Sequence, residues 1–199
     1  MSSQTNQKPA FDFLERVFHM GHIINMIILL LSGFQIHSAS FNIFGAMGNA
    51  RVFHFFFGWF FLYIGLWHTY RFYVLGTYKT SMPHPIKNRR ELIQSIKYYL
   101  FIEDSEPISV TGDRKEYGEL QKLTYTSVFI ISGMQIVLGF FLYWPETFMG
   151  LSAVLGGLQW VRYLHYLIAW MFVFFTMVHL YMVFVEGLKR FKKMILGKA

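Results

Sequence analysis

The chain has 199 residues, of which 54% are hydrophobic and only 15% are charged. So few charges cannot cover the surface of a soluble domain of this size, and the composition therefore predicts an integral membrane protein. The absence of cysteine excludes disulfides, cysteine-bound iron–sulfur clusters and covalently attached c-type haem within the chain. The net charge of +7 is better explained by basic residues beside a membrane than by nucleic acid, which we do not expect as a partner.

Four apolar runs are each long enough, at about 20 residues or more, to cross a bilayer. They cover residues 17–37, 52–75, 123–144 and 160–187. Together they predict an all-α fold, in which residues 1–199 form a single domain that is an integral membrane four-helix bundle.

The basic residues predict the orientation of this bundle. Fifteen of the eighteen Lys and Arg lie before the first run, in the connection 76–122 or after the fourth run. Arg71 lies just inside that same boundary, and only Arg51 and Arg162 fall on the other side. The positive-inside rule therefore predicts that both termini and the long connection are cytoplasmic.

The long connection contains apolar residues at helical spacing, namely Leu92, Ile93, Ile96, Tyr99 and Leu100. This spacing predicts an amphipathic helix between the second and third spans. Such a helix would lie on the inner membrane surface or pack against the end of the bundle. The sequence does not decide between these two positions.

Ionisable side chains are costly inside a membrane, so the histidines of the spans need a reason. His165 and His179 of the fourth span are 14 residues apart, which corresponds to about 21 Å of helix rise and about 40° of net rotation. Their rings therefore face one side at two depths, too far apart for one metal ion but suited to two stacked haems. His54 lies at the depth of His165, and His19 lies toward the depth of His179. This pattern predicts two b haems, each held by two histidines through the haem iron.

Several histidines leave alternatives open. His68 follows His54 by 14 residues, so on spacing alone it competes with His19 as the inner ligand. His22 is one turn from His19 and could contact a quinone, a haem propionate or only a neighbouring helix. His37 and His84 have the positions of loop residues. A proton-relay transporter is a further reading, but a relay needs histidines linked along one path, whereas these pair at two levels.

An arginine precedes three of the proposed ligands by three residues. R-V-F-H occurs at 16–19 and at 51–54, and R-Y-L-H at 162–165. Residues three apart share a helical face, so Arg16, Arg51 and Arg162 are candidates to neutralise haem propionates. Ordinary anchoring at the membrane interface is the alternative role.

All four spans together resemble the b-type cytochrome subunit of membrane-bound nickel–iron hydrogenases and the related gamma subunit of formate dehydrogenase. The resemblance rests on R-V-F-H (16–19), A-R-V-F-H-F (50–55), G-F-F-L-Y (139–143) and L-H-Y-L-I-A-W-M-F-V-F-F-T-M-V-H-L-Y-M (164–182). The long connection is similar as well, in K-Y-Y-L-F (97–101). The last of the four span motifs is the most specific.

The resemblance implies that the ligands come from the first, second and fourth spans, which favours His19 over His68. His68 then becomes a polar neighbour of the inner haem. It also implies that quinone reacts near that haem, in a pocket lined by the loop before the third span. Here that loop offers Tyr117, Gln121 and Lys122. It reads Y-G-E-L-Q-K where formate dehydrogenase gamma subunits tend to read Y-N-A-G-Q-K.

The activity that the resemblance implies belongs to a complex in a bacterial or archaeal inner membrane. The chain would carry electrons from the iron–sulfur small subunit and the catalytic large subunit of a periplasmic hydrogenase or formate dehydrogenase to menaquinone or ubiquinone. It would contribute a quinone-reactive cytochrome b to this oxidoreductase, with no hydrogen or formate site of its own. A quinol-oxidising anchor of a thiosulfate or polysulfide reductase is the alternative.

Overall fold

The computed structural model of the protein describes residues 13–74, 76, 78, 82–104, 118–186, 191–192 and 194–195. These residues contain helices and no strand, so the predicted all-α fold is confirmed. The helices are α1 (Phe13–His37), α2 (Met47–Val74), α4 (Arg89–Tyr99), α6 (Glu119–Tyr143), α7 (Met149–Val154) and α8 (Leu158–Val185).

Four of these helices, α1, α2, α6 and α8, are long and apolar enough to cross a membrane, which confirms the four predicted spans. Each helix begins a few residues before the corresponding apolar run. A helix of 28 residues, such as α8, is about 42 Å long, whereas the hydrocarbon layer is about 30 Å thick. The helix is therefore longer than the hydrocarbon layer is thick. The predicted ends at Leu75 and Gly187 lie outside the described residues.

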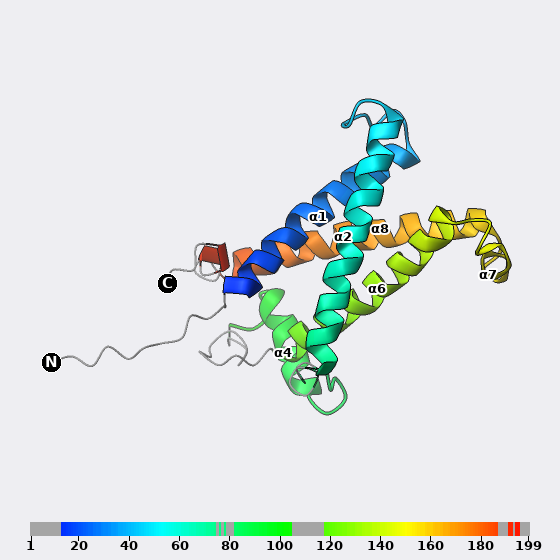
Figure 1. Cartoon of the computed structure of the whole chain (residues 1–199). Coiled ribbons are helices and arrows are strands. Elements are labelled where there is room, and N and C mark those ends of the chain that lie inside the picture. Colours follow the sequence, from blue (N-terminus) through cyan, green and yellow to red (C-terminus); the bar gives the residue numbers. More distant parts are fainter. Residues whose placement is uncertain are drawn as a thin grey trace.

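The spans form two helical hairpins (Figure 1). One consists of α1 and α2, and the other consists of α6 and α8 with α7 in the connection. Helices pack more closely within each hairpin than between the two. We call the end of the bundle where α1 and α6 begin, near α4, the α4 end, and the opposite end the α7 end.

The buried core between the hairpins is small. It consists of Phe61 of α2, Leu138 of α6 and three residues of α8, which are Val161, Ile168 and Phe172. Large apolar side chains elsewhere on the spans are widely exposed. This is the pattern of helices surrounded by lipid, whose association depends on close packing rather than on removing apolar surface from water.

Hydroxyl groups within the spans bond to their own helices. Ser32, Thr69, Thr124 and Thr176 each donate to the carbonyl oxygen four residues earlier, at 2.6 to 2.8 Å. A hydroxyl in the hydrocarbon layer has no water to bond to, so this local bond removes the cost of burying it.

Gln35 holds the connection between α1 and α2 at the α7 end. Its side chain is only 2% exposed. The oxygen Oε1 accepts hydrogen bonds from the backbone N–H groups of Ile43 and Phe44, at 3.0 and 2.8 Å, while Nε2 donates to the Gly45 carbonyl at 2.9 Å. One buried amide side chain thus satisfies three backbone groups of the loop.

We expect Gln35→Leu to destabilise the protein by about 2 kcal/mol, because it removes the three hydrogen bonds that hold the connection between α1 and α2. Thermal unfolding in detergent, followed by circular dichroism, measures the effect. The matched control is Gln159→Leu at an exposed position of the same end, for which we expect little change. Equal midpoints for the two variants would contradict the role of Gln35.

The predicted helix in the long connection is present as α4, and one of its faces packs on the bundle. Ser95 and Tyr99 are buried. The Tyr99 hydroxyl donates to Glu186, just after α8, and the Tyr181 hydroxyl donates to the Tyr99 carbonyl. Packing against the end of the bundle is therefore observed. The opposite apolar face, with Ile93, Ile96 and Leu100, is exposed, and its contact with the membrane surface stays a prediction.

Glu119 fastens the segment before α4 to the first turn of α6. The side chain is 1% exposed and accepts hydrogen bonds from the His84 backbone N–H and, at 2.8 Å, from the Asn88 amide. Its backbone N–H donates to Glu91 at 3.0 Å. A carboxylate at a helix N-terminus is also favoured by the helix dipole. The α4 end is thus tied together by buried polar groups.

Two glycines set the start of α8. Gly156 and Gly157 have φ angles of 89° and 94°, a conformation that other residues rarely adopt. A Cβ on Gly156 would also lie 2.6 Å from the Trp160 ring. This turn ends α7 and begins α8, and it therefore fixes the depth of the residues that follow on α8.

Candidate functional site: two facing histidine pairs

At the α7 end, His54 of α2 faces His165 of α8. The centroids of the two rings are 6.2 Å apart, and their planes are inclined at 73°. Both side chains are half-buried. The structure thus brings together the two histidines that the sequence analysis pairs at this depth.

At the α4 end, His19 of α1 faces His179 of α8. Their ring centroids are 6.3 Å apart and the planes are inclined at 58°. Phe175, one turn earlier on α8, stacks on His179 at 5.8 Å. The second predicted pair is therefore also brought together, and the two pairs share α8.

The ring separations suit a metal atom between each pair of imidazoles. Two imidazoles that bind one metal from opposite sides, each through a bond of about 2.0 Å, have centroids about 6 Å apart. Among the described residues, no group of three or more His, Asp or Glu is placed to hold a metal ion. Two protein ligands are enough for haem, because the porphyrin supplies the other nitrogens. The residues present therefore fit haem.

Ser32 orients the ring of His54. Its hydroxyl lies 3.0 Å from Nδ1 of His54 and donates its single proton to the Ile28 carbonyl at 2.6 Å. The hydroxyl must therefore accept from the imidazole, which puts the ring proton on Nδ1. Nε2 of His54 is then left unprotonated, as metal ligation requires.

We expect Ser32→Ala to weaken haem retention at the α7 end about 10-fold, the lower end of the effect of losing a group that orients a metal ligand. The rate at which haem transfers to apomyoglobin measures retention. Thr69→Ala is the matched control, since the Thr69 hydroxyl donates to the Gly65 carbonyl of its own helix at 2.8 Å. An unchanged transfer rate in the Ser32 variant would contradict the orienting role.

Two glycines make room for the rings of the α7-end pair. A Cβ on Gly33 of α1 would lie 3.1 Å from Cε1 of His54, and a Cβ on Gly139 of α6 would lie 3.6 Å from Cε1 of His165. The first distance is closer than an ordinary contact, so only glycine lets α1 approach His54 without displacing the ring. The pair is therefore enclosed by all four spans.

Gln135 of α6 is a further polar neighbour of this pair that the sequence analysis missed. Its Nε2 lies 3.3 Å from Nε2 of His165 and 3.2 Å from the His165 carbonyl oxygen. Nδ1 of His165 is buried and has no hydrogen-bond partner. The sequence does contain a sign of this contact, because Gln135 is an amide within an otherwise apolar run.

Three buried nitrogens toward the α4 end have no hydrogen-bond partner. Nε of Arg16, Nδ1 of His19 and Nε1 of Trp67 are buried without a hydrogen-bond partner. Trp67 stacks on Phe18, beside His19, at 5.5 Å. Buried donors are normally satisfied, so these nitrogens fit a bound group that carries acceptors, as a haem carries propionates. No motif in the sequence points to Trp67.

The arginines at the α7 end are exposed. Arg162 lies one turn before His165, and its guanidinium donates to Gln159 at 3.4 Å. Arg51 lies one turn before His54 on α2. Both are thus where the sequence analysis expects them, next to the half-buried pair and nearer the α7 end.

His68 contacts His22 rather than the α4-end pair. The two Nε2 atoms are 3.0 Å apart, and the rings stack with centroids 5.1 Å apart. Phe61 packs against His22 edge-on at 6.4 Å. The structure therefore assigns partners to both histidines whose roles the sequence left open.

The remaining histidines lie at the ends of the bundle. His37 is the last residue of α1, not a loop residue, and its ring stacks on Tyr166 at 3.8 Å. The expected loop position of His37 is therefore wrong, since the residue belongs to α1 and its ring packs on α8. His84 does lie in the connection before α4, where Glu119 binds its backbone.

The structure describes three of the four candidate quinone residues, which are His22, Gln121 and Lys122. Tyr117 lies outside the described residues. Gln121 and Lys122 occupy the first turn of α6, and Oε1 of Gln121 accepts from the Gly118 backbone N–H at 3.2 Å. His22, the other candidate, pairs with His68 between α1 and α2.

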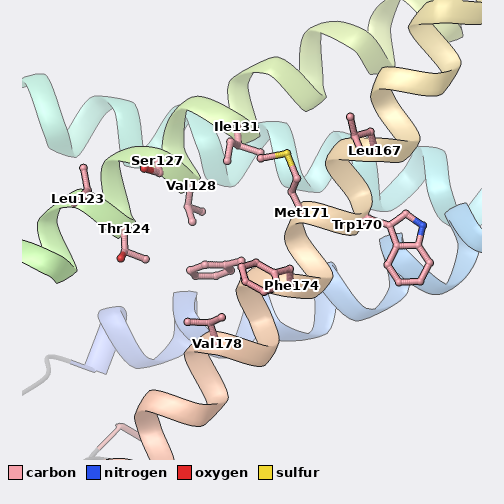
Figure 2. A pocket seen from close by; sticks show the side chains of 11 residues that line it. Leu123, Thr124, Ser127, Val128, Ile131, Leu167, Trp170, Met171, Phe174 and Val178 are labelled. Atoms are coloured by element: carbon pink, nitrogen blue, oxygen red, sulfur yellow. The ribbon is translucent and has the colours of Figure 1, made fainter. Parts of the chain in front are cut away.

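An apolar groove of about 510 Å³ begins just beyond Lys122 and runs between α6 and α8 (Figure 2). Thr124 and Ser127 line it on α6, and Phe174, Phe175 and Val178 line it on α8. Phe175 also stacks on His179. The groove therefore leads from the lipid-facing surface to the neighbourhood of the α4-end pair.

The fold and the facing rings define a class of protein. It is a multi-pass membrane protein in which two pairs of imidazoles are separated by the distance that suits a metal atom between them. Residues 10–197 match the family model of the prokaryotic cytochrome b561 family, so the chain belongs to that family. It is therefore a transmembrane electron-transfer subunit that uses haem b, and the resemblance to b-type cytochromes is confirmed. Among curated proteins, none matches the sequence.

Proposed function

We propose that the chain holds two b haems, one between His54 and His165 and the other between His19 and His179. The observation that carries this proposal is the pair of imidazole separations, 6.2 and 6.3 Å, at two levels of one helix. Haem bound in this way supplies one-electron transfer and leaves no open iron position for oxygen chemistry. His68 is then a polar neighbour of the α4-end haem and not one of its ligands.

The three arginines neutralise propionates in this proposal. Arg51 and Arg162 lie one turn nearer the α7 end than their histidines, and Arg16 lies one turn nearer the α4 end than His19. The buried, unpartnered Nε of Arg16 supports this role. A guanidinium can bind a carboxylate through two parallel hydrogen bonds.

We assign the α7 end to the periplasmic side, from the distribution of basic residues. The partners there are the iron–sulfur small subunit and the catalytic large subunit of a hydrogenase or, failing that, a formate dehydrogenase. Membership of the cytochrome b561 family supports a redox complex of this kind. The chain itself carries electrons across the membrane between these partners and the quinone pool.

Quinone reacts at the cytoplasmic α4 end, where Gln121 and Lys122 are candidates to contact the headgroup, together with Tyr117, which lies outside the described residues. The groove between α6 and α8 begins next to Lys122, and its apolar lining suits an isoprenoid tail. Phe175 joins this groove to His179. Menaquinone and ubiquinone both have the headgroup and tail that such a site requires.

An optical experiment on the complex, extracted with its native partners in mild detergent, tests the proposal. We expect two b-haem signals that become reduced when hydrogen is added anaerobically. Reduction by formate alone would identify a formate dehydrogenase instead. Reduction by quinol alone would favour the quinol-oxidising anchor of a reductase, and the absence of a Soret band would refute the haem proposal.

A further inference from the structure

The hydrogen-bonded pair formed by His22 and His68 is not used by the proposed electron path. Its Nε2 atoms are 3.0 Å apart, which is hydrogen-bond distance. Such a bond between two neutral imidazoles needs one ring to donate and the other to accept. One ring nitrogen, the Nδ1 of the donating ring, is then left with a lone pair that can accept a proton.

The pair lies one helical turn deeper in the bundle than His19 on α1 and than Arg71 on α2. His22 follows His19 by one turn of α1, a rise of about 4.5 Å. His68 precedes Arg71 by one turn of α2, and Arg71 lies 3.5 Å from Glu15, both side chains being about one-third exposed. Polar groups thus continue along α2 from this partly exposed ion pair to the His22–His68 pair.

We propose that the His22–His68 pair takes up a proton from the α4-end aqueous phase when the neighbouring haem is reduced. This inference rests on the proposed function. The haem site gains one electron from its redox donor, and the pair gains one proton from water. The proton binds the free Nδ1 of the donating ring, and the bond between the Nε2 atoms becomes charge-assisted. Oxidation releases the same electron and the same proton.

Proton uptake is favoured because the negative charge of the added electron attracts positive charge nearby. Three carboxylates near this end have partners. Glu15 pairs with Arg71, Glu119 binds His84 and Asn88, and Glu186 binds Tyr99. Among the described residues, the other charged or titratable side chains of α1, α6 and α8 toward this end include Arg16, His19, Lys122 and His179.

Coupling between the two events is reciprocal, so the proton must also change the affinity for the electron. We therefore expect the midpoint potential of the α4-end haem to fall with rising pH. One proton per electron corresponds to about 59 mV for each tenfold change in proton concentration. The α7-end haem, about 20 Å of helix away, should show little dependence on pH.

Optical redox titrations of the purified complex between pH 6 and 8 test the inference. His22→Gln and His68→Gln retain a polar side chain that cannot take up a proton, so each should keep both haems and flatten the pH dependence. His37→Gln at the other end is the matched control and should keep the wild-type slope. In the His54→Ala background, only the α4-end haem is observed, which assigns the signal.

Two haems with potentials independent of pH in the wild type, or an unchanged slope in both glutamine variants, would overturn this inference and leave the proposed function standing. Absence of the two haem signals would refute the proposed function, and the inference with it. If one variant does not fold, the other variant and the wild-type slope still decide the question.

Discussion

His54→Ala and His165→Ala should each yield a protein with one haem instead of two. Either substitution removes one of the two imidazoles at the α7 end, whose ring centroids are 6.2 Å apart, and a haem with one protein ligand is held weakly. His19 and His179 are untouched, so the second haem should remain. The ratio of haem to protein, from pyridine haemochrome absorbance, measures the loss.

His37→Ala is the control for this prediction, because it removes a histidine from the same end whose ring stacks on Tyr166. It should keep two haems. Loss of both haems from a folded His54 or His165 variant, or of neither, would show that these two residues are not paired at one iron.

His19→Ala and His68→Ala should differ, and the difference decides which of them is the ligand at the α4 end. His19 faces His179 at 6.3 Å, whereas His68 bonds to His22 at 3.0 Å. We therefore expect His19→Ala to lose one haem and His68→Ala to keep two. Low-temperature absorption spectra, in which two b haems give separate α bands, measure which haem is lost.

The opposite result, with the haem lost in the His68 variant and kept in the His19 variant, would move the ligand to α2. Both haems would then be held between α2 and α8 alone. His22→Ala is the control, since it breaks the bond to His68 and leaves both candidate ligands in place.

The sequence predicted the spans and the facing histidines because both depend on simple regularities. A hydrocarbon layer needs long apolar runs, and a spacing of 14 residues returns to nearly the same helical face. These rules led to His165 and His179 on α8 and to the depths of His19 and His54. They do not depend on how the helices are packed together.

The residues that contact these histidines could not be predicted in the same way. Ser32 and Gln135 reach His54 and His165 from α1 and α6, and such contacts depend on how far each helix is rotated. The bond between His22 and His68 joins residues 46 positions apart. Periodicity along one helix carries no information about the rotation of its neighbour.

The structure gives a physical reason why residues 117–122 read Y-G-E-L-Q-K and not the Y-N-A-G-Q-K that is typical of formate dehydrogenase gamma subunits. Glu119 is buried and binds the segment before α4, so this acidic residue holds the connection in place. Its partners, His84 and Asn88, lie more than 30 positions earlier. A local motif could not reveal this tie.

The division into two hairpins has a consequence for how the protein matures in the cell. Each proposed ligand pair takes one histidine from the α1–α2 hairpin and one from α8, while the helices pack more closely within the hairpins than between them. With haem bound as proposed, each ligand pair would join the two hairpins, which pack less closely against each other than their own helices do. Newly inserted chains should accumulate in step with the supply of haem, and chains that lack it should be degraded by membrane proteases.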